Sequence, residues 1–399
     1  MIEQWLVEGI KGIGRYFLHP FVYYFILYSL VISHLKIKRE RASFHTRVYD
    51  YWDDVRFTYK NGFLAGIILS LITVILGVTL PFGTVLVWTI VTFLFSLLVK
   101  PRWLSAAFTI GVTTFLVAVL MKWGAYPSWM DQFLVGINET NFQMLAILIV
   151  LLILAEGILV YQTAHKRTTP FLVKSSRGLP IGNHEAKRTW ILPLLLLVPG
   201  GNFISPSGWW PVLSIHDQTY LILVVPFVLG FQQRVQGSLP EESIRTTGKR
   251  IVWLAVACIA PLVVSFWYPL FAFVTVFVAL VGRELITVKQ RLNDDSAAFF
   301  FSKRDEGLMV LGILPNSPAE KMNLQVGETI LKVNGFQVKS DSEFYEALQK
   351  NRAYCKLEIK DLNGEIRFSQ GALYEGSHHE LGILFVEDHP KWKESRVPS

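Results

Sequence analysis

Long blocks of apolar residues dominate the first 290 positions of this chain and restrict its fold more than any other feature. A helix rises 1.5 Å per residue, so about 20 such residues cross a hydrocarbon layer about 30 Å thick. Only 17% of the residues are charged, against about 25% in soluble domains. The sequence therefore predicts an α-helical polytopic membrane protein. The blocks are Tyr16–Leu35, Gly62–Leu80, Phe82–Val99, Trp103–Met121, Phe142–Val160, Ile191–Ser205, Thr219–Phe231, Ile251–Trp267 and Tyr268–Gly282.

Basic residues fall almost entirely on alternate segments between these blocks. Cytoplasmic loops of membrane proteins carry an excess of Lys and Arg, so we expect these segments and everything after residue 283 in the cytoplasm, and the N-terminus outside. Basic residues flank Ile191–Phe231 and Ile251–Gly282 at both ends, so each stretch should cross and return. We expect about nine spans, with seven as the alternative if Ile191–Phe231 is a re-entrant pair. The segments Lys36–Asn61, Lys100–Arg102, Tyr161–Trp190, Gln232–Arg250 and Arg283–Gln290 hold 21 of the 24 basic residues before position 291.

Charge and cysteine content exclude several other classes. Residues 1–290 carry 24 basic against 14 acidic side chains, whereas residues 291–399 carry 14 against 17. The basic excess therefore reflects sidedness in the membrane and not nucleic-acid binding. Cys258 and Cys355 lie in different domains, so we expect neither a disulfide nor a CxxC metal site. The chain has no GxxxxGK[ST] string, and we predict no cofactor.

Glu156 is the single acidic residue well inside a full-length predicted span. A buried acid in a span is a candidate for a proton relay or an ion pathway. The sequence offers no Lys, Arg or His partner inside the membrane. A regulatory transporter is therefore one alternative function, and hydrogen bonding within the helix bundle is the competing interpretation.

A membrane protease is the second alternative. A zinc protease needs two histidines at i and i+4 around a glutamate base, and the strings that begin at His184 and His379 lack the second histidine. Ser207 near His216 is the one candidate for a serine protease. A polar turn explains that string better, because Ser, Pro and Gly are turn residues. We therefore predict no catalytic and no metal-binding residues.

From about Leu292 the pattern changes to short strands with Gly and Pro between them, which predicts a separate α+β domain. Ser317-Pro318 predicts the start of a short helix. Gly327, Asn334-Gly335 and Asn363-Gly364 suit tight turns, the last within a hairpin. Glu343–Lys350 has the pattern of an amphipathic helix. The strings KRDEGLMV, LPNSPAE and LQVGETILKVNG, which begin at Lys303, Leu314 and Leu324, resemble a PDZ domain.

This resemblance implies a peptide-binding groove. In PDZ domains a peptide adds as an extra strand beside a helix, and a glycine-containing loop holds its carboxylate. Packing of Leu308 and Met309 in the core of a strand is the competing interpretation. The resemblance implies Gly307, Leu308, Met309 and Val310 for the loop, Lys303 as the basic residue before it, and Asp341, Tyr345 and Leu348 on the groove helix.

Three further strings, FLHP at Phe17, KRER at Lys38 and FHTR at Phe44, accompany this domain order. Together they resemble the MinJ family of cell-division topological determinants in Bacillota. The resemblance implies a non-enzymatic membrane scaffold at septa and poles that bridges the scaffold DivIVA to the division inhibitor MinD and its partner MinC. Other proteins of the division machinery are further implied partners.

The basic segment after the first span suggests a contact with anionic lipid headgroups, where each basic residue contributes about 1 kcal/mol. Lys36, Lys38, Arg39 and Arg41 are the candidates, and setting the topology is their main expected role. The predicted parts of the chain are an interfacial helix or helical extension at 1–15, a transmembrane domain at 16–286, a linker at 287–302, a PDZ-like domain at 303–386 and a polar tail at 387–399.

Overall fold

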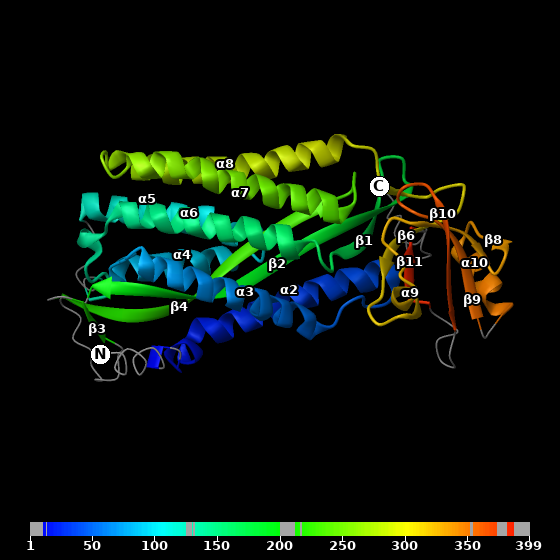
Figure 1. The fold of residues 1–399 in the computed structure, drawn as a ribbon, viewed down its shortest axis with the longest axis horizontal. Helices are drawn as coiled ribbons and strands as arrows, with labels where there is room; N and C mark the ends of the chain where they lie inside the picture. The colour runs from blue at the N-terminus through cyan, green and yellow to red at the C-terminus, as the bar shows by residue number, and fades with distance from the viewer. Residues whose placement is uncertain are drawn as a thin grey trace, which may run out of the picture.

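The computed structural model describes residues 11–12, 14–124, 130, 132–199, 212–215, 218–351, 354–372 and 381–386. A long helical part and a smaller C-terminal domain lie end to end (Figure 1). Helix α2, Pro20–Phe44, begins at the end of the helical part opposite the C-terminal domain. Most of the predicted helix at 1–15 and all of the tail at 387–399 lie outside the described residues.

Apolar helices form the outer part of the membrane domain. Within the part of the chain that the structure describes, five of them are long and apolar enough to cross a membrane: α2, α3, α6 with its continuation to Ala164, α7 and α8. Two more, α4 and α5, are apolar but shorter. The bounds are α2 Pro20–Phe44, α3 Tyr51–Ile75, α4 Phe82–Ser96, α5 Ala106–Trp123, α6 Phe142–Leu159, α7 Pro240–Val264 and α8 Leu270–Ser296.

A long β-hairpin stands where the two short helical spans Ile191–Ser205 and Thr219–Phe231 were expected. The described residues of these spans, 191–199 and 219–231, form strands, so their assignment to helices is wrong. Strand β2 covers Pro180–Pro199 and pairs antiparallel with β4, Gln218–Val235. Figure 1 shows both strands running along the helical bundle. Helices cover both faces, so the strands read as unbroken apolar runs without the alternation of a half-exposed strand. The chain still runs along the bundle and returns antiparallel to itself, but it does so in β structure. Short strands β1, Thr169–Lys174, and β3, Val212–Ile215, complete the order β1-β2-β4-β3.

Helix α3 covers the open edge of β2 with small and hydroxyl-bearing residues. The Ser70 hydroxyl donates to the carbonyl of Pro193 at 2.8 Å and accepts from the amide of Leu195 at 2.9 Å. The Thr73 hydroxyl also lies 3.1 Å from the carbonyl of Leu195. A Cβ on Gly66 would lie 2.6 Å from the nitrogen of Pro193, so only glycine permits this approach. An exposed sheet edge is not tolerated in lipid, and the α3 contacts remove it.

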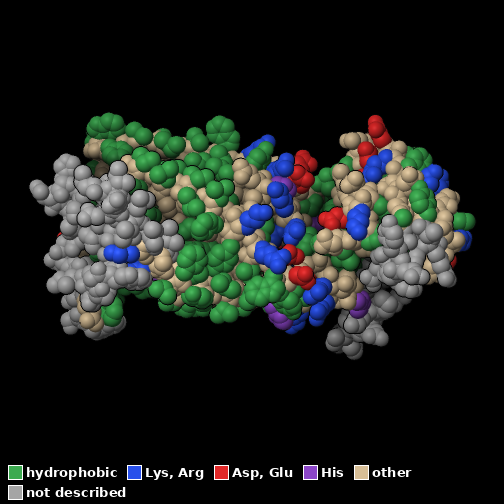
Figure 2. All heavy atoms as spheres, turned by 60° about the horizontal axis from the view of Figure 1, so that its bottom comes forward, with side chains coloured by type: hydrophobic (Ala, Val, Ile, Leu, Met, Phe, Trp, Pro, Cys, Tyr) green, Lys and Arg blue, Asp and Glu red, His purple; other side chains and the backbone are tan. Residues whose placement is uncertain are grey.

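The outer surface of the helical part is apolar. On the face shown in Figure 2, hydrophobic side chains are spread over the helical part, and Lys and Arg side chains gather where it meets the C-terminal domain. This distribution is that of a membrane protein with a basic belt at one boundary.

The C-terminal domain is a small sheet with two helices. Its strands are ordered β10-β9-β7-β6-β11, and β8 pairs with β7. The short helix predicted after Ser317 is confirmed and is α9. The predicted amphipathic helix is also confirmed and is α10. Gly327, Asn334, Gly335 and Gly364 all have positive φ, which confirms the predicted turns. The bounds are β6 Leu308–Ile313, α9 Pro318–Lys321, β7 Thr329–Val333, β8 Phe336–Gln337, α10 Asp341–Gln349, β9 Tyr354–Lys360, β10 Ile366–Ala372 and β11 Ile383–Phe385.

A helix and a paired strand connect the two parts, in place of the linker predicted at 287–302. Helix α8 continues to Ser296, and β5, Phe301–Ser302, pairs with β2 at Ile181 and Gly182. An apolar cluster fills the junction, with Met309 and Leu311 of β6 on one side and Leu172 of β1 on the other. The C-terminal domain is therefore docked on the end of the hairpin.

Candidate functional site

The loop expected to hold a peptide carboxylate lies inside the sheet. Leu308–Ile313 form β6, which pairs with β7 on one edge and with β11 on the other. Leu308, Met309 and Val310 are buried, while Lys303 is exposed ahead of the strand. With both edges paired, β6 cannot accept an added strand, so the groove assigned to Gly307–Val310 is not formed there. The competing interpretation, packing of Leu308 and Met309 in a core, is what the structure has.

The free edge of this sheet belongs instead to β11. No strand pairs with its second edge within the parts of the chain that the structure covers. Helix α10 lies beside it, and the rings of Phe344 and Phe385 meet edge to face at 5.0 Å. An open strand edge beside a helix is the geometry that PDZ domains use to bind peptides. Sequence reasoning missed it because Leu381-Gly382-Ile383 follows the recognised strings instead of preceding them.

Gly382 shapes the entrance to this edge. Its φ is +80°, and a Cβ there would lie 2.4 Å from the Cβ of Ser317. Its carbonyl accepts from the amide of Leu314 at 2.8 Å. Of the predicted helix residues, Tyr345 is half-buried against the core and Asp341 opens α10, whereas Leu348 is fully buried in the core. Tyr345 is therefore the predicted residue that remains a candidate for contact with a peptide.

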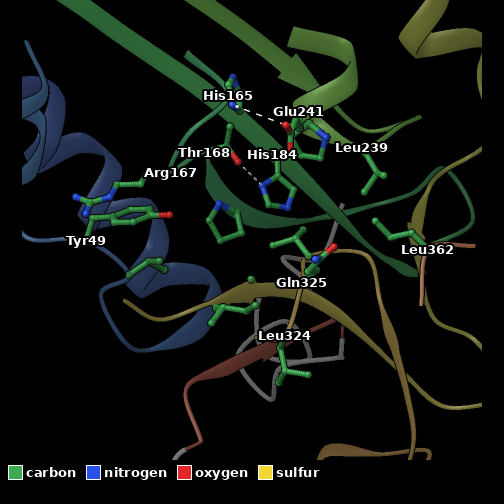
Figure 3. Close-up of a pocket in the computed structure, with 16 residues that line it drawn as sticks. Tyr49, His165, Arg167, Thr168, His184, Leu239, Glu241, Leu324, Gln325 and Leu362 are labelled. Carbon is green, nitrogen blue, oxygen red and sulfur yellow. Dashed lines mark hydrogen bonds and ion pairs between the residues drawn. The ribbon is translucent and has the colours of Figure 1, made fainter. Parts of the chain in front are cut away.

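A cavity of about 400 Å³ separates the membrane part from the C-terminal domain (Figure 3). His165, Arg167 and His184 line one side, and Leu324 and Gln325 line the other. A hydrogen bond of 2.9 Å joins Nδ1 of His184 to the Thr168 hydroxyl. Burial lowers the pKa of His184 to about 4, so the ring is neutral at physiological pH. His184 thus belongs to the junction, while His379, Ser207 and His216 of the protease strings lie outside the described residues.

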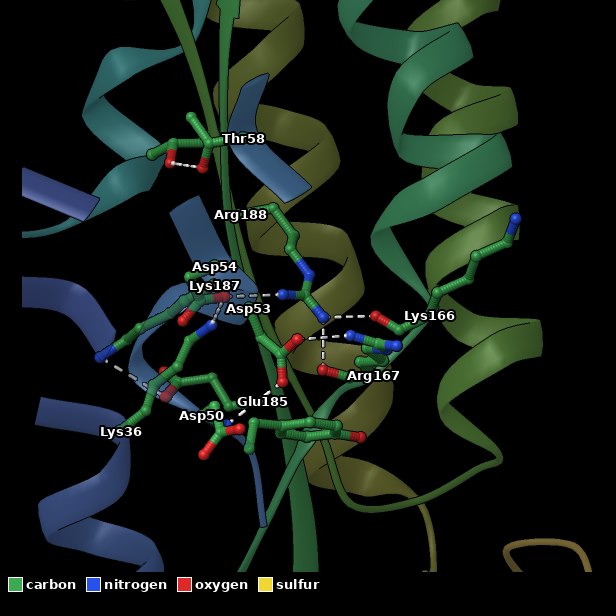
Figure 4. Close-up of polar contacts among 12 residues, drawn as sticks. Lys36, Asp50, Asp53, Asp54, Thr58, Lys166, Arg167, Glu185, Lys187 and Arg188 are labelled. Carbon is green, nitrogen blue, oxygen red and sulfur yellow. Dashed lines mark hydrogen bonds and ion pairs between the residues drawn. The ribbon is translucent and has the colours of Figure 1, made fainter. Parts of the chain in front are cut away.

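A network of ion pairs lies beside the junction, where α2, α3 and β2 meet (Figure 4). Asp54 joins Lys36 at 2.7 Å and Arg188 at 3.0 Å. Arg39 pairs with Glu185, whose pKa is lowered by the nearby charges of Arg39 and Lys187 in spite of its burial. Buried pairs like these hold elements together only when every partner is present.

This network corrects the assignment of basic residues to lipid headgroups. Lys36 is 7% exposed, and both Lys36 and Arg39 are engaged in ion pairs inside the protein. Lys38 and Arg41 are exposed on the same helix and stay candidates for headgroup contact. The positive charge of this region was predicted correctly, but the sequence did not show which of its cations pair with acids.

Glu156 is fully buried and pairs with Arg283. The sequence had offered no Lys, Arg or His partner inside the predicted spans. Its Oε1 accepts from Nε of Arg283 at 2.9 Å, and Arg283 is 3% exposed. Its Oε2 accepts from the Ser105 hydroxyl at 2.6 Å and from the amide of Ala106 at 3.2 Å. Glu156 therefore ties α6 to α8 and caps the start of α5. Sequence reasoning missed this partner because it placed Arg283 in the cytoplasmic segment that follows the last apolar block. In the structure α8 continues without a break past that block and includes Arg283.

Comparison with known proteins gives two results. A sequence profile of the PDZ domain matches residues 309–360. The chain is 49% identical to the cell division topological determinant MinJ of Bacillus subtilis (strain 168) over 97% of both chains. It is 27% identical to the probable cell division topological determinant MinJ of Lacticaseibacillus paracasei, over 71% of this chain and 79% of that protein. The serine protease HTRA3 of mouse is 31% identical over only 22% of this chain and 20% of its own length.

Proposed function

Because the chain belongs to the family of MinJ cell-division topological determinants, we propose that it is a non-enzymatic membrane adaptor in division-site selection. In this proposal its cytoplasmic surfaces bridge a polar and septal scaffold of the DivIVA type to the division inhibitor MinD and its partner MinC. The N-terminus lies outside, the PDZ domain lies in the cytoplasm, and the protein collects at septa and poles.

The observation that carries the proposal is the open edge of β11 beside α10. A partner segment in extended conformation can add to this edge, with main-chain hydrogen bonds for affinity and side-chain pockets for specificity. The edge lies on a domain that β5 and the apolar junction cluster fix to the membrane part. A partner already on the membrane meets the groove at high effective concentration, so a weak contact suffices.

Glu156 supports this assignment over transport. Both of its carboxylate oxygens are engaged, by Arg283, Ser105 and Ala106. A carboxylate held in this way serves the packing of three helices. The transport alternative rested on this residue alone and loses its support.

A substitution in the groove tests the proposal. Tyr345→Glu puts a charge on the side of α10 that packs against the core, whereas Ser342→Glu adds the same charge on the exposed side of the same helix. Fluorescent fusions are followed in a rod-shaped Gram-positive cell that lacks its own copy, with and without DivIVA, together with labelled MinD.

We expect septal signal that depends on DivIVA, and loss of MinD from septa in Tyr345→Glu but not in Ser342→Glu. Uniform membrane signal of the unaltered protein would refute the adaptor assignment. Normal MinD recruitment by a folded Tyr345→Glu protein would refute the role of the groove while leaving the adaptor assignment in place.

A further inference from the structure

A second pocket lies at the ends of α6 and α7 that face the C-terminal domain. It has a volume of about 350 Å³, and Tyr161, Arg245, Thr246 and Lys249 line it together with Glu241 and Glu242. Neither the peptide groove nor the ion-pair network uses Arg245, Lys249 or Tyr161. The pocket therefore needs an explanation of its own.

Close packing of α6 on α7 fixes the shape of this pocket. A Cβ on Gly248 would lie 2.6 Å from the amide nitrogen of Tyr161, and one on Gly157 would lie 2.8 Å from that of Val252. Directly after this crossing, α6 widens into a π-helical turn at Val160–Ala164. Such turns often mark functional sites, and here the turn carries the aromatic ring of Tyr161 to the surface of α7.

Two cations flank that ring. The guanidinium carbon of Arg245 and the Nζ of Lys249 each lie 5.7 Å from its centroid. Arg245 also pairs with Glu241 at 2.9 Å, but both side chains are largely exposed. An exposed pair four residues apart on a helix contributes little to stability. A phosphate group can therefore compete for Arg245.

The pocket lies at the level of the membrane surface. The apolar run of α7 begins at Ile251, two residues after Lys249. Trp253 is 69% exposed one turn further on, and exposed Val256 and Ile259 follow it. Residues four apart share a face of a helix, so Arg245, Lys249 and Trp253 form one stripe from the cations to the lipid-facing surface. Tryptophan at this depth is typical of a membrane interface.

We propose that this pocket binds the headgroup of one phospholipid molecule. Its phosphodiester lies between Arg245 and Lys249 beside the Tyr161 ring, and its acyl chains run along Trp253 and Val256. Basic pockets between membrane helices are known to bind lipid headgroups.

The two acids of the pocket restrict the class of lipid. Glu241 and Glu242 lie on the first turn of α7, beyond the cations as seen from the membrane. Carboxylates accept hydrogen bonds and repel further negative charge. The headgroup should therefore carry donors beyond its phosphate, as the hydroxyls of phosphatidylglycerol do. Phosphatidylcholine has the same phosphodiester but no such donor.

Native mass spectrometry of the full-length protein in detergent tests the site, with phosphatidylglycerol or phosphatidylcholine titrated in. The variant Arg245→Gln/Lys249→Gln removes both cations. The control Lys289→Gln/Arg291→Gln removes two exposed cations from the end of α8. Tyr161→Leu is a second test that leaves all charges in place, and thermal melting shows that each variant is folded.

We expect the unaltered protein and the control to retain one phosphatidylglycerol in preference to phosphatidylcholine. The double variant should bind it roughly thirtyfold more weakly, as expected for the loss of two basic contacts near a membrane surface, and Tyr161→Leu should also weaken it. Equal losses in the double variant and the control would overturn the proposal. Equal retention of the two lipids, or displacement of the lipid by glycerol phosphate at millimolar concentration, would also overturn it.

Discussion

Removing the guanidinium of Arg283 should destabilise the membrane domain more than any other single loss of charge in this region. The Arg283→Leu variant leaves the carboxylate of Glu156 buried with only the Ser105 hydroxyl and the Ala106 amide as partners. Loss of one partner of a buried ion pair typically costs about 3–5 kcal/mol. Both side chains lie at the low end of exposure, at 0% for Glu156 and 3% for Arg283, so solvent screening does not reduce this figure.

The same geometry predicts a rescue. In Glu156→Gln/Arg283→Leu the amide oxygen of the new side chain can still accept from Ser105 and Ala106, and no charge is left buried. Replacing both members of a buried ion pair with uncharged residues often changes stability little. The double variant should therefore recover about 2 kcal/mol or more of what Arg283→Leu loses.

Thermal melting in detergent measures both effects. For domains of this size about 1 kcal/mol shifts the midpoint by roughly 2–4 °C, so a cost of about 3–5 kcal/mol should lower the melting midpoint of Arg283→Leu by about 6–20 °C. Arg47→Leu breaks an exposed pair with Asp50 and serves as the control, with an expected cost of at most about 1 kcal/mol. A midpoint for Arg283→Leu equal to that of the control, or a double variant no better than Arg283→Leu, would refute the reasoning.

Three further predictions concern the hairpin, the junction and the C-terminal core. Gly66→Ala should lower the melting temperature, because its Cβ would lie 2.3 Å from Cδ of Pro193, whereas Gly14→Ala meets nothing within 4 Å and should not; equal effects would exclude the close contact of α3 with β2. Because burial lowers the pKa of His184 to about 4 from an ordinary 6.5, the unfolded chain binds the extra proton between these values, and stability should fall as the pH drops from 6.5 to 4. His184→Gln should flatten this part of the profile, and an unchanged slope would count against the buried ring. Burial raises the pKa of Cys355 to about 12, so a maleimide at pH 8 should label it only after unfolding, and rapid labelling of the native protein would contradict its place in the core.

The sequence predicted the elements whose determinants are local. Ser317, Asn334-Gly335 and Asn363-Gly364 are caps and turns set by neighbouring residues, and the structure has them where expected. The gathering of the basic segments at one end of the helical part likewise follows from the sequence and agrees with the belt of Lys and Arg in Figure 2.

What the sequence could not predict depends on contacts between distant segments. Leu192–Val198 is rich in leucine and reads as a helix, and it becomes a strand only because α3 and β4 satisfy its two edges. Pairing of Glu156 with Arg283 spans 127 positions. The position of the peptide groove was missed because β11 joins the sheet from the far end of the domain, after the strings that identify it.

The buried hairpin has a consequence for how this protein enters the membrane. A helix can pass into lipid on its own because its backbone bonds are internal, but an isolated apolar strand cannot. Strand β2 is synthesised after α3 and before β4, so one of its edges has a partner waiting while the other stays open until about thirty more residues emerge. The insertion machinery must therefore shelter β2 until β4 arrives, and helices α2 to α6 with the hairpin should leave it as one unit.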